Sequence, residues 1–456
     1  MGRTLTAIIL AAGKGTRMKS TRAKVVHRVA GRPILRYVLD AVRGVDAKEI
    51  LVIVGDRADD VRAELADDAV RMVEQKRQLG TGHAVFQARG IAAGEMLLIV
   101  PGDLPLLTAA VLEAFLAYHA RERAALSVLS MVLPSPGAYG RVLRDTKGSP
   151  TRIVEARDAT AEESAICEVN CGIYCVSNDA FLWESLSLLK TANAQREYYL
   201  PDLVERFRSA RRKVAAVAVD DPRRVLGINS RAELARAERV LREEKVEELM
   251  ASGVTVLDPE RTYVEPTVAV GQDTVLLPGT HLVGNTRIGE HCTIGPDTWV
   301  EDSTVEEGCR VRYSVLESAK VRPRSKVGPY AHLRPGADVG PEVRIGNFVE
   351  VKASRVRRGA KAGHLAYLGD AEVGEEANIG AGVITCNLGY HGKTKHRTKI
   401  GDRAFIGSNA SLIAPVTVGE DAVVGAGSTI AEEVPAGTLA IGRARQVIKK
   451  KKEARE

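Results

Sequence analysis

Apolar residues in the first half of the chain follow two alternating spacings. Short runs rich in Val, Ile and Leu alternate with segments of helical spacing up to about residue 221. The apolar runs are 6–10, 50–54 and 96–100, and the first segment of helical spacing is 34–42. This alternation predicts a mostly parallel sheet with helices on both faces. Ligands bind beyond the carboxyl ends of such strands, and Gly13 and Asp103 each follow one.

The segment 229–253 has the pattern of a single long helix. Ser230 can cap its amino end, Glu233 stands three residues later as in a capping box, and Gly253 can end it. We predict that this helix links two domains, an α/β domain over residues 1–228 and a second domain over residues 254–456.

A period of six residues replaces the earlier pattern after Val254. An aliphatic residue stands at every sixth position in three runs, often followed by glycine. The runs are 288–300, 321–351 and 400–430. Hexapeptide repeats predict a parallel β-helix, in which each unit forms one flat face and three units form a coil. The segments between the runs, 301–320 and 352–399, are expected to be irregular coils or excursions, where functional residues often lie.

Composition limits the classes of function. Only 4% of the 456 residues are aromatic, as a narrow core of small aliphatic side chains requires. The net charge is +7, but acidic residues interrupt almost every basic stretch apart from Lys449–Lys452. This distribution favours small phosphorylated ligands over nucleic acid.

The cysteines and the apolar runs indicate in which cellular compartment the protein is expected. The six cysteines form no CxxC pair, and Cys167, Cys171 and Cys175 are predicted to be buried thiols of a strand rather than metal ligands. This cysteine usage is typical of the reducing cytoplasm. The amino-terminal residues lack the architecture of a signal peptide, and no run of 18 apolar residues predicts a membrane span.

A loop rich in small residues follows the first predicted strand, with the sequence Leu10-Ala-Ala-Gly-Lys-Gly-Thr-Arg17-Met18. Its small residues let the backbone approach a ligand, and its N–H groups can hold phosphates together with Lys14 and Arg17. The loop is neither a dinucleotide-binding G-x-G-x-x-G nor a P-loop. Taken alone, it is also compatible with a simple tight turn.

This loop and several downstream segments resemble the signature of the sugar-1-phosphate nucleotidyltransferases. The segments closest to those of the uridylyltransferase acting on N-acetylglucosamine-1-phosphate are Leu79-Gly-Thr-Gly-His83, Ala138-Tyr-Gly-Arg141, Ile153-Val-Glu155 and Gly227-Ile-Asn229. The resemblance implies that Asp103 and Asn229 bind Mg²⁺. It implies that Arg17 and Lys24 act in catalysis by neutralising charge as the sugar phosphate attacks UTP. The implied UDP-N-acetylglucosamine ligands are Leu10, Ala11, Ala12, Gly13, Lys24, Gln75, Gly80, Thr81, Gly140, Glu155, Asn170 and Asn229.

Three positions depart from the pattern of that family. Pro101 stands where the family has an aromatic residue, Ala23 where it has proline, and Cys171 where it has threonine. None of these changes removes a charge or a metal ligand. They leave open the shape of the pocket and the strictness of sugar specificity, rather than the type of reaction.

A second motif lies in the segment expected to be an excursion. The string Lys361-Ala-Gly-His364-Leu-Ala-Tyr367-Leu-Gly-Asp370 and the preceding Gly346-Asn-Phe-Val-Glu350 resemble the hexapeptide acetyltransferase half of the bifunctional GlmU family. The resemblance covers nearly the whole chain. It implies a Rossmann-like nucleotidyltransferase domain followed by a left-handed parallel β-helix. It also implies that His364 is the general base that deprotonates the amine of glucosamine-1-phosphate.

The same resemblance implies the ligands of the second site. Those for glucosamine-1-phosphate are Arg334, Lys352, Tyr367 and Asn378. Those for acetyl-CoA are Ala381, Asn387, Tyr390, Ser408, Ala426 and Arg443. The segment 386–392 departs from the family's C-N-Y-D-G, with Leu388-Gly389 as an insertion and His391 in place of the usual Asp. The contacts of this loop therefore depend on an altered backbone.

The resemblance as a whole implies a cytoplasmic homotrimer that uses acetyl-CoA, UTP and Mg²⁺. It would acetylate glucosamine-1-phosphate and convert the resulting N-acetylglucosamine-1-phosphate to UDP-N-acetylglucosamine for peptidoglycan and other envelope glycans. Trimerisation would cover flat apolar faces of the β-helix. No nucleic-acid or membrane partner is expected. Two alternatives stay open: a nucleotidyltransferase whose β-helix only regulates or oligomerises it, and a non-catalytic scaffold. The basic segment 446–456 is interpreted as a solvated tail or as a contact for CoA phosphates.

Overall fold

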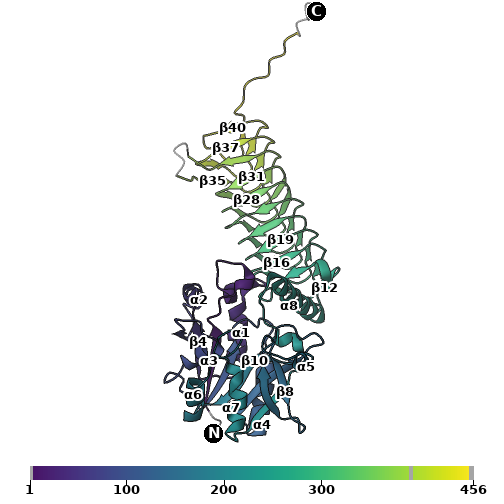
Figure 1. Cartoon of the computed structure of the whole chain (residues 1–456). Coiled ribbons are helices and arrows are strands. Elements are labelled where there is room, and N and C mark those ends of the chain that lie inside the picture. The colour runs from purple at the N-terminus through teal and green to yellow at the C-terminus, as the bar shows by residue number, and fades with distance from the viewer. Residues whose placement is uncertain (1–3, 390–393, 451–456) are drawn as a thin grey trace, which may run out of the picture. The chain divides into compact units, whose positions relative to one another are not determined.

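The computed structural model describes residues 4–389 and 394–450, and the chain forms two compact units, residues 1–240 and 241–456 (Figure 1). Each unit has its own sheets and its own hydrophobic core. Within the described residues, none of the helices is both long and apolar enough to cross a membrane.

The first unit is an α/β domain built on one sheet. Its main path runs in the order β11-β7-β10-β6-β1-β4-β5, and all pairs are parallel except the two made by β10. The strands are β1 Leu5–Ala11, β4 Glu49–Val54, β5 Arg71–Glu74, β6 Met96–Pro101, β7 Leu126–Val132, β10 Glu168–Ser177 and β11 Val214–Ala218. A hairpin of β8 Arg141–Arg144 and β9 Pro150–Val154 extends from β10. The predicted mostly parallel sheet is confirmed.

Helices cover both faces of this sheet because successive side chains of a strand point to opposite sides. In β1, Ile9 belongs to one hydrophobic cluster and Ile8 to the other. The first cluster includes α1 Ile34–Arg43, α2 Ala58–Glu64 and α4 Ala109–Glu122. The second includes α3 Thr81–Phe86, α6 Ala180–Ser187 and α7 Leu203–Ser209. The carboxyl ends of β1 and β6 meet at one edge, since Leu10 pairs with Pro101.

The long helix predicted over 229–253 is α8, Arg231–Ala251. Its capping box is present, since the Glu233 N–H donates to the Ser230 hydroxyl at 3.3 Å and the Ser230 N–H donates to the Glu233 carboxylate at 2.9 Å. After the helix, Gly253 adopts a φ of +94°, a backbone conformation that favours glycine. The division between the two units falls within α8, between Val240 and Leu241.

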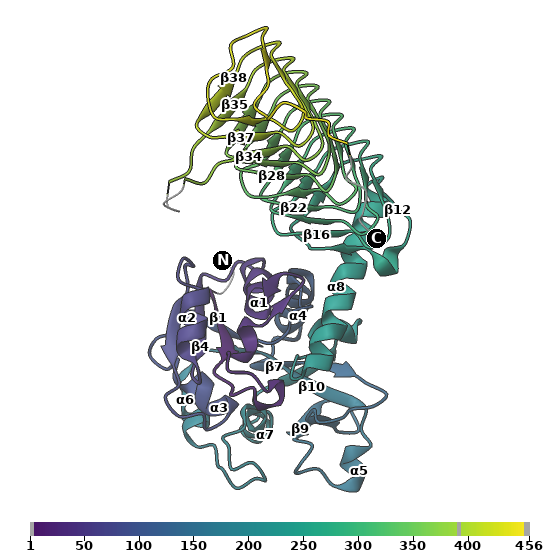
Figure 2. The same cartoon turned by 90° about the horizontal axis from the view of Figure 1, so that it is seen from above.

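The second unit is a left-handed parallel β-helix, whose coils stack so that every third strand joins the same sheet (Figure 2). Three sheets of 11, 10 and 9 short parallel strands extend from β12 Thr255–Val256 to β41 Leu439–Ala440. Inward-facing aliphatic residues from all three sheets form one continuous core. The β-helix predicted from the six-residue period is therefore confirmed.

Two segments expected to be irregular are in fact mostly regular coils. Segment 301–320 contains β20 Thr304–Val305, β21 Arg310–Val311 and β22 Val315–Glu317, all within the stacked sheets. In segment 352–399 the inward positions include Val356, Ala362, Leu368, Val373 and Ile379, all buried. Steps of five residues and a small Ala at an inward position interrupted the strict period of six. Among the described residues of this segment, the chain leaves the coil between β34 Ile384–Cys386 and β35 Thr398–Ile400.

Two neighbouring coils approach closely where glycine lies on glycine. Gly346 of β27 Arg344–Asn347 stacks on Gly363 of β30 Lys361–His364. A Cβ atom at position 346 would lie 1.9 Å from the Gly363 carbonyl oxygen, whereas a Cβ at position 363 would meet nothing within 4 Å. The stacking therefore requires glycine at 346 and only tolerates it at 363.

We predict that Gly346→Ala destabilises the second unit by about 2–4 kcal/mol, because β27 and β30 must separate to admit the methyl group. Gly363→Ala is the matched control and is expected to change stability by less than about 1 kcal/mol. Urea unfolding of the full chain, followed by circular dichroism, measures both. Equal unfolding midpoints for the two variants would contradict the close approach described here.

Candidate active sites

A cavity of about 650 Å³ lies at the carboxyl ends of β1 and β6 in the first unit. It is lined by every residue predicted to bind the nucleotide sugar and by both predicted metal ligands. These residues are Leu10, Ala11, Ala12, Gly13, Lys24, Gln75, Gly80, Thr81, Asp103, Gly140, Glu155, Asn170 and Asn229. Residues from widely separated parts of the sequence thus converge at one sheet edge, as parallel strands require.

Backbone conformation fixes one wall of this cavity. Gly80 has a φ of +109°, and a Cβ there would lie 2.7 Å from the Tyr198 carbonyl oxygen, so only glycine fits. The buried Gln75 side chain donates from Nε2 to the Gly80 carbonyl oxygen at 3.1 Å. Gln75 therefore also holds the turn that leads into α3, and Thr81 begins that helix.

A second wall brings together Gly140, Glu155 and Asn170. The Asn170 N–H donates to the Gly140 carbonyl oxygen at 2.8 Å, and a Cβ on Gly140 would lie 3.3 Å from Glu155 Oε1. The Asn170 side chain is oriented by its own bonds, donating from Nδ2 to the Tyr174 hydroxyl at 2.8 Å and accepting from the Gly172 N–H at 2.9 Å. The wall offers a carboxyl group and an amide to a polyhydroxyl ligand.

Burial, together with the nearby carboxylates of Asp158, Asp202 and Glu197, raises the pKa of Glu155 to about 7, against the opposing charge of Arg141. Near neutral pH this carboxyl group therefore exists in both protonation states. It can donate a hydrogen bond as well as accept one, which suits recognition of a sugar hydroxyl.

Oxygen atoms of the two predicted metal ligands converge on a single cation in this structure. Lys24 Nζ lies 2.5 Å from Asp103 Oδ2 and 3.0 Å from Asn229 Oδ1. A carboxylate and an amide oxygen are hard ligands of the kind that Mg²⁺ prefers alongside phosphate oxygens. The donor set therefore fits a magnesium ion. Within the described residues, no group of three or more His, Cys, Asp or Glu side chains forms a denser metal cluster.

The predicted catalytic residue Arg17 does not line this cavity. It lines a neighbouring cavity of about 540 Å³ together with Arg223 and Arg236. Tyr139, Gly227 and Asn229 line both cavities, and the Tyr139 hydroxyl accepts from the Gly227 N–H at 3.3 Å. A role for Arg17 in neutralising phosphate charge stays a prediction.

The positions that depart from the family pattern have distinct surroundings. Pro101 and Cys171 both line the cavity, whereas the Ala23 N–H donates to Asp60. The Cys171 thiol donates to the Leu129 carbonyl oxygen at 2.8 Å, and burial raises its pKa to about 12. Of the three thiols predicted to be buried in β10 and just before it, Cys167 is exposed, because it precedes the strand. That prediction is wrong for Cys167.

The second set of predicted residues lies on the β-helix. His364 ends β30 and is exposed, and its Nδ1 lies 2.5 Å from Asn347 Oδ1 on the neighbouring coil. Asn378 begins β33 Asn378–Ile379, which pairs with β30 on its other side. His364 was predicted to lie on an excursion, but it belongs to a regular coil. The stacked backbone therefore fixes its position.

Cationic side chains gather at the sheet that adjoins the one containing His364. Arg334 follows β25 His332–Leu333, and Lys352 ends β28 Glu350–Lys352. The pKa of Lys352 is held below its ordinary value by contact with the Lys395 ammonium group, then by the charges of Lys395 and Arg334. Arg334 also donates to Glu350 at 2.7 Å. Lys395 was not among the predicted site residues; the fold brings it there only because the chain returns after residue 387.

Tyr367 completes this group at the start of β31 Tyr367–Gly369. Lys352 pairs in register with Gly369, and a Cβ on Gly369 would lie 2.4 Å from the Tyr367 hydroxyl oxygen. Glycine at 369 therefore makes room for the tyrosine ring beside Lys352. A basic group, a phenol and an imidazole thus come from β28, β31 and β30.

Four residues predicted to bind acetyl-CoA mark one corner of the coils. Ala381, Ser408, Ala426 and Arg443 each follow a strand of the same sheet, after β33, β36 Phe405–Ile406, β39 Val423–Val424 and β41. The Asn409 N–H donates to the Ala381 carbonyl oxygen at 2.7 Å, and the Gly427 N–H donates to that of Ser408 at 2.8 Å. Three of these four residues, Ala381, Ser408 and Ala426, have small side chains.

The altered loop lies between β34 and β35. Asn387 is buried and donates from Nδ2 to Asp370 Oδ2 at 2.5 Å. The His396 N–H donates to the Asn387 carbonyl oxygen, and the Gly389 N–H donates to that of Thr394, so both ends of the loop are held together. Tyr390 and His391 lie outside the described residues.

Comparisons with known proteins support both halves. A model of MobA-like NTP transferase domains matches residues 7–146, and a model of six bacterial transferase hexapeptide repeats matches residues 397–432. A protein of Halalkalibacterium halodurans named bifunctional protein GlmU is 47% identical over 445 residues, covering 97% of each chain. A protein of the same name from Carboxydothermus hydrogenoformans is 47% identical over 442 residues, covering 97% of this chain and 98% of its own.

A solved structure of UDP-glucose pyrophosphorylase complexed with UDP-glucose covers 52% of this chain and 98% of its own, with 17% sequence identity and a TM-score of 0.41. The family assignment does not depend on it. The two folds and the two matched domain models define a bifunctional transferase, with a nucleotidyltransferase domain followed by a hexapeptide-repeat acyltransferase domain. The chain belongs to the GlmU family.

The raised pKa of Glu155 predicts a specific dependence of stability on pH. The folded state binds this proton more tightly than the unfolded state, because the pKa is about 7 when folded against an ordinary value of 4.5. The stabilisation from Glu155 is complete below about pH 4.5 and is lost as pH rises through 7. Glu155→Gln carries no charge at any pH.

We therefore compare the free energies of unfolding of Glu155→Gln and the native protein. As pH rises from 5 to 8.5, the difference should move in favour of Glu155→Gln by roughly 2–3 kcal/mol. Chemical unfolding of the full chain at several pH values measures this gain. The exposed Glu162→Gln in α5 Ala161–Ser164 is the control and should follow the native curve. A gain that is the same at pH 5 and pH 8.5 would show that Glu155 is ionised throughout.

Proposed function

We propose that the chain acetylates glucosamine-1-phosphate in its second unit and converts the product to UDP-N-acetylglucosamine in its first. The observation that carries this proposal is the presence of two separate groups of residues, each suited to one reaction. The first unit has a cavity of about 650 Å³ lined by Asp103, Lys24 and Asn229. The second has His364 and, associated with the adjoining sheet, a cluster of three cations that includes Lys352.

Acetyl transfer requires a base, because an amine that attacks a thioester must lose a proton. His364 presents an exposed imidazole at the end of β30 and accepts this proton as the amine nitrogen bonds to the acetyl carbon. The carbon–sulfur bond of acetyl-CoA then breaks, and the thiolate leaves and is protonated to the free thiol. Arg334, Lys352 and Lys395 hold the phosphate group of the sugar by charge, while Tyr367 and Asn378 orient the sugar.

Uridylyl transfer requires no general base, since an oxygen of the sugar phosphate is already an anion. That oxygen bonds to the α-phosphorus of UTP, and pyrophosphate leaves. When bound by Asp103 and Asn229, Mg²⁺ neutralises charge on the phosphates. The loop that follows β1 brings backbone N–H groups to the phosphates, and Lys24 adds a positive charge. Glu155 and Asn170 orient the sugar.

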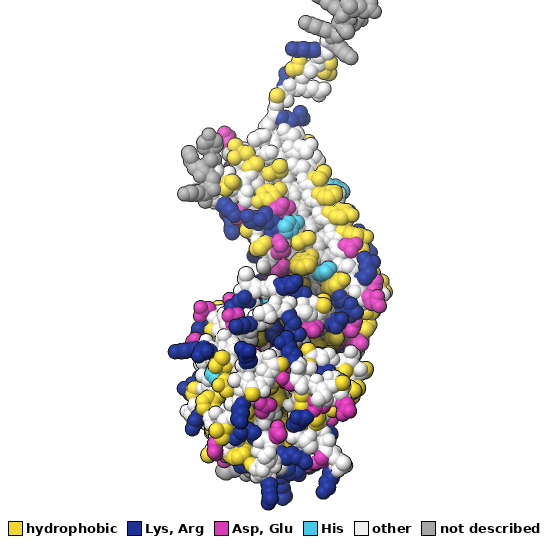
Figure 3. All heavy atoms as spheres, viewed as in Figure 1, with side chains coloured by type: hydrophobic (Ala, Val, Ile, Leu, Met, Phe, Trp, Pro, Cys, Tyr) yellow, Lys and Arg dark blue, Asp and Glu magenta, His cyan; other side chains and the backbone are white. Residues whose placement is uncertain are grey.

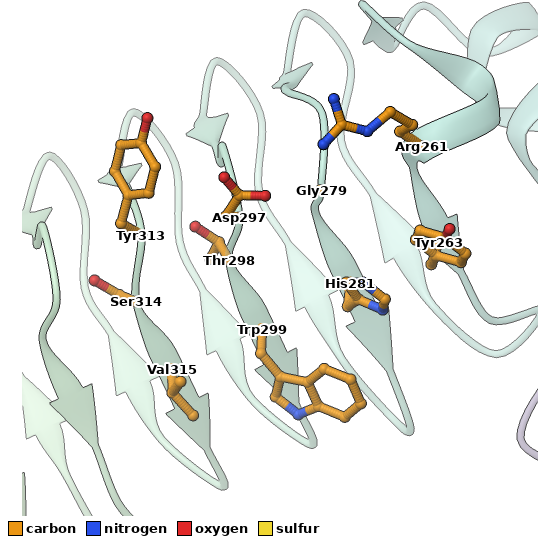
Figure 4. A pocket seen from close by; sticks show the side chains of 10 residues that line it. All are labelled: Arg261, Tyr263, Gly279, His281, Asp297, Thr298, Trp299, Tyr313, Ser314 and Val315. Atoms are coloured by element: carbon orange, nitrogen blue, oxygen red, sulfur yellow. The ribbon is translucent and has the colours of Figure 1, made fainter.

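A homotrimer forms part of the proposal, and exposed aromatic side chains on the β-helix support it. Hydrophobic side chains gather along this unit (Figure 3). Near its first coils, Tyr263, His281 and Trp299 stack with ring centroids 4.3 Å and 5.3 Å apart beside a hollow of about 470 Å³ (Figure 4). Tyr330 and Phe348 stack farther along and are each 56% exposed. Such surface is normally covered by another chain.

The compartment and the use of the product complete the proposal. All six cysteines have free thiols, which supports a reducing cytoplasm. The product, a nucleotide sugar carrying N-acetylglucosamine, is an activated donor suited to peptidoglycan and other envelope glycans. The substrates are the two sugar phosphates, UTP and acetyl-CoA.

Separate sites predict that each activity can be removed alone. We expect His364→Ala to lower thiol release from acetyl-CoA about 10²- to 10⁴-fold, as the loss of a general base does. The same variant should release pyrophosphate from UTP and N-acetylglucosamine-1-phosphate at the native rate. Asp103→Asn should have the opposite effect, because it removes the carboxylate ligand.

The control for the histidine variant is His291→Ala, which changes an exposed histidine on a distant coil and should leave both activities intact. Both reactions are followed on the same purified protein, with glucosamine-1-phosphate as acceptor in the first. If either active-site substitution stopped both reactions in a folded protein, the assignment of one reaction to each unit would be wrong.

A further inference from the structure

A side chain on the coil next to His364 fixes how that histidine presents its two nitrogens. Asn347 and His364 are paired in register between β27 and β30. Asn347 Oδ1 and His364 Nδ1 are 2.5 Å apart. An amide oxygen can only accept a hydrogen bond, so the proton of the neutral imidazole must be on Nδ1. The lone pair is then on Nε2.

We propose that Asn347 is a positioning residue, which holds His364 in the tautomer whose Nε2 accepts the proton of the substrate amine. The inference rests on the proposed acetyl transfer. A base in the other tautomer would present an N–H to the amine and could not accept its proton. The partner of the second ring nitrogen commonly selects which nitrogen is free.

The stacking of the coils explains why this contact is well defined. Gly346 must be glycine because its coil lies against Gly363, and these two residues directly precede Asn347 and His364. The charged residues Arg344 and Lys361 stand three positions earlier on the same strands, while Asn378 of the third paired strand is uncharged. Glu350 and Tyr367 belong to strands of the adjoining sheet. Asn347 is thus the neutral partner at the end of the strand pair.

The test compares Asn347→Ala, Asn347→Asp and the native protein in acetyl transfer. We expect Asn347→Ala to lower kcat about 10- to 100-fold with little change in KM for glucosamine-1-phosphate, as the loss of an orienting partner does. Asp also accepts from Nδ1 and should restore most of kcat. Its added negative charge should move the acid limb of the kcat/KM profile to higher pH.

Control measurements separate this inference from the proposed function. Arg344→Ala, on the same strand as Asn347 but exposed, tests for local disruption and should retain native kcat when assayed as folded protein. If His364→Ala is inactive but Asn347→Ala has native kcat, the positioning role is overturned while the function stands. If Asp restores nothing and leaves the pH profile unchanged, the role is overturned as well. If His364→Ala retains activity, the proposed function itself fails.

An independent observation concerns Lys24, whose ammonium group lies between the two oxygens suited to bind Mg²⁺. The distances are 2.5 Å to Asp103 Oδ2 and 3.0 Å to Asn229 Oδ1, and the Lys24 and Asp103 side chains are only 14% and 16% exposed. A divalent ion held by both oxygens would lie within a few ångströms of this ammonium. Like charges at that distance repel strongly in a partly buried site.

We infer that Lys24 suppresses the binding of a free divalent cation and that UTP relieves this by drawing the ammonium to its phosphates. The metal would therefore bind together with the nucleotide. This inference also rests on the proposed function, but its test needs no turnover. Electron paramagnetic resonance of Mn²⁺, titrated with the full chain without nucleotide, reports the bound ion directly.

Lys24→Met keeps the length of the side chain without its charge, and we expect it to bind Mn²⁺ at least tenfold more tightly than the native protein. Adding Asp103→Asn to Lys24→Met should remove this gain. Lys48→Met, which changes an exposed lysine that does not line the cavity, should match the native protein. Equal Mn²⁺ affinity for the native protein and Lys24→Met, or a gain that survives Asp103→Asn, would overturn the inference. Uridylyl transfer by the native protein tests the function separately.

Discussion

Parallel pairing of neighbouring strands is the constraint on which both units depend. In the first unit it aligns Leu10 with Pro101, so that the loops after two strands open at one edge and face one cavity. In the second it stacks coil on coil, so that Asn347 lies beside His364 and Lys352 beside Gly369. A shift of one residue in either register would turn these side chains to the opposite face.

The two sites use opposite electrostatics, which follows from the chemistry they support. In the first unit, burial and several nearby carboxylates suppress the negative charge of Glu155 by raising its pKa. The second unit gathers Arg334, Lys352 and Lys395, and mutual repulsion makes the Lys352 ammonium easier to deprotonate. An anion bound there would relieve that repulsion. Without a ligand, the first site therefore has an excess of carboxylates and the second an excess of cations.

Much of this could be predicted from the sequence, because the strongest signals are periodic or local. The period of six gave the β-helix, and the capping box at Ser230 and Glu233 gave the start of α8. The coils around Ala362 were missed because a buried alanine and steps of five residues interrupt the pattern of a large aliphatic residue at every sixth position. Asn347 and Lys395 were missed for another reason: their importance arises from neighbours 17 and 43 positions away.

Coil stacking also fixes the spacing of the residues that are proposed to bind the acyl donor. The residues proposed to hold acetyl-CoA follow four successive strands of one sheet, and the strand of His364 directly precedes them in that sheet. Adjacent strands are about 4.8 Å apart, so the distance from the base to the last of these coils is roughly four such steps, or about 19 Å. Distances along this surface can change only in whole coils. If these residues hold acetyl-CoA as proposed, a thioester with a short carrier would contact only the coils nearest His364.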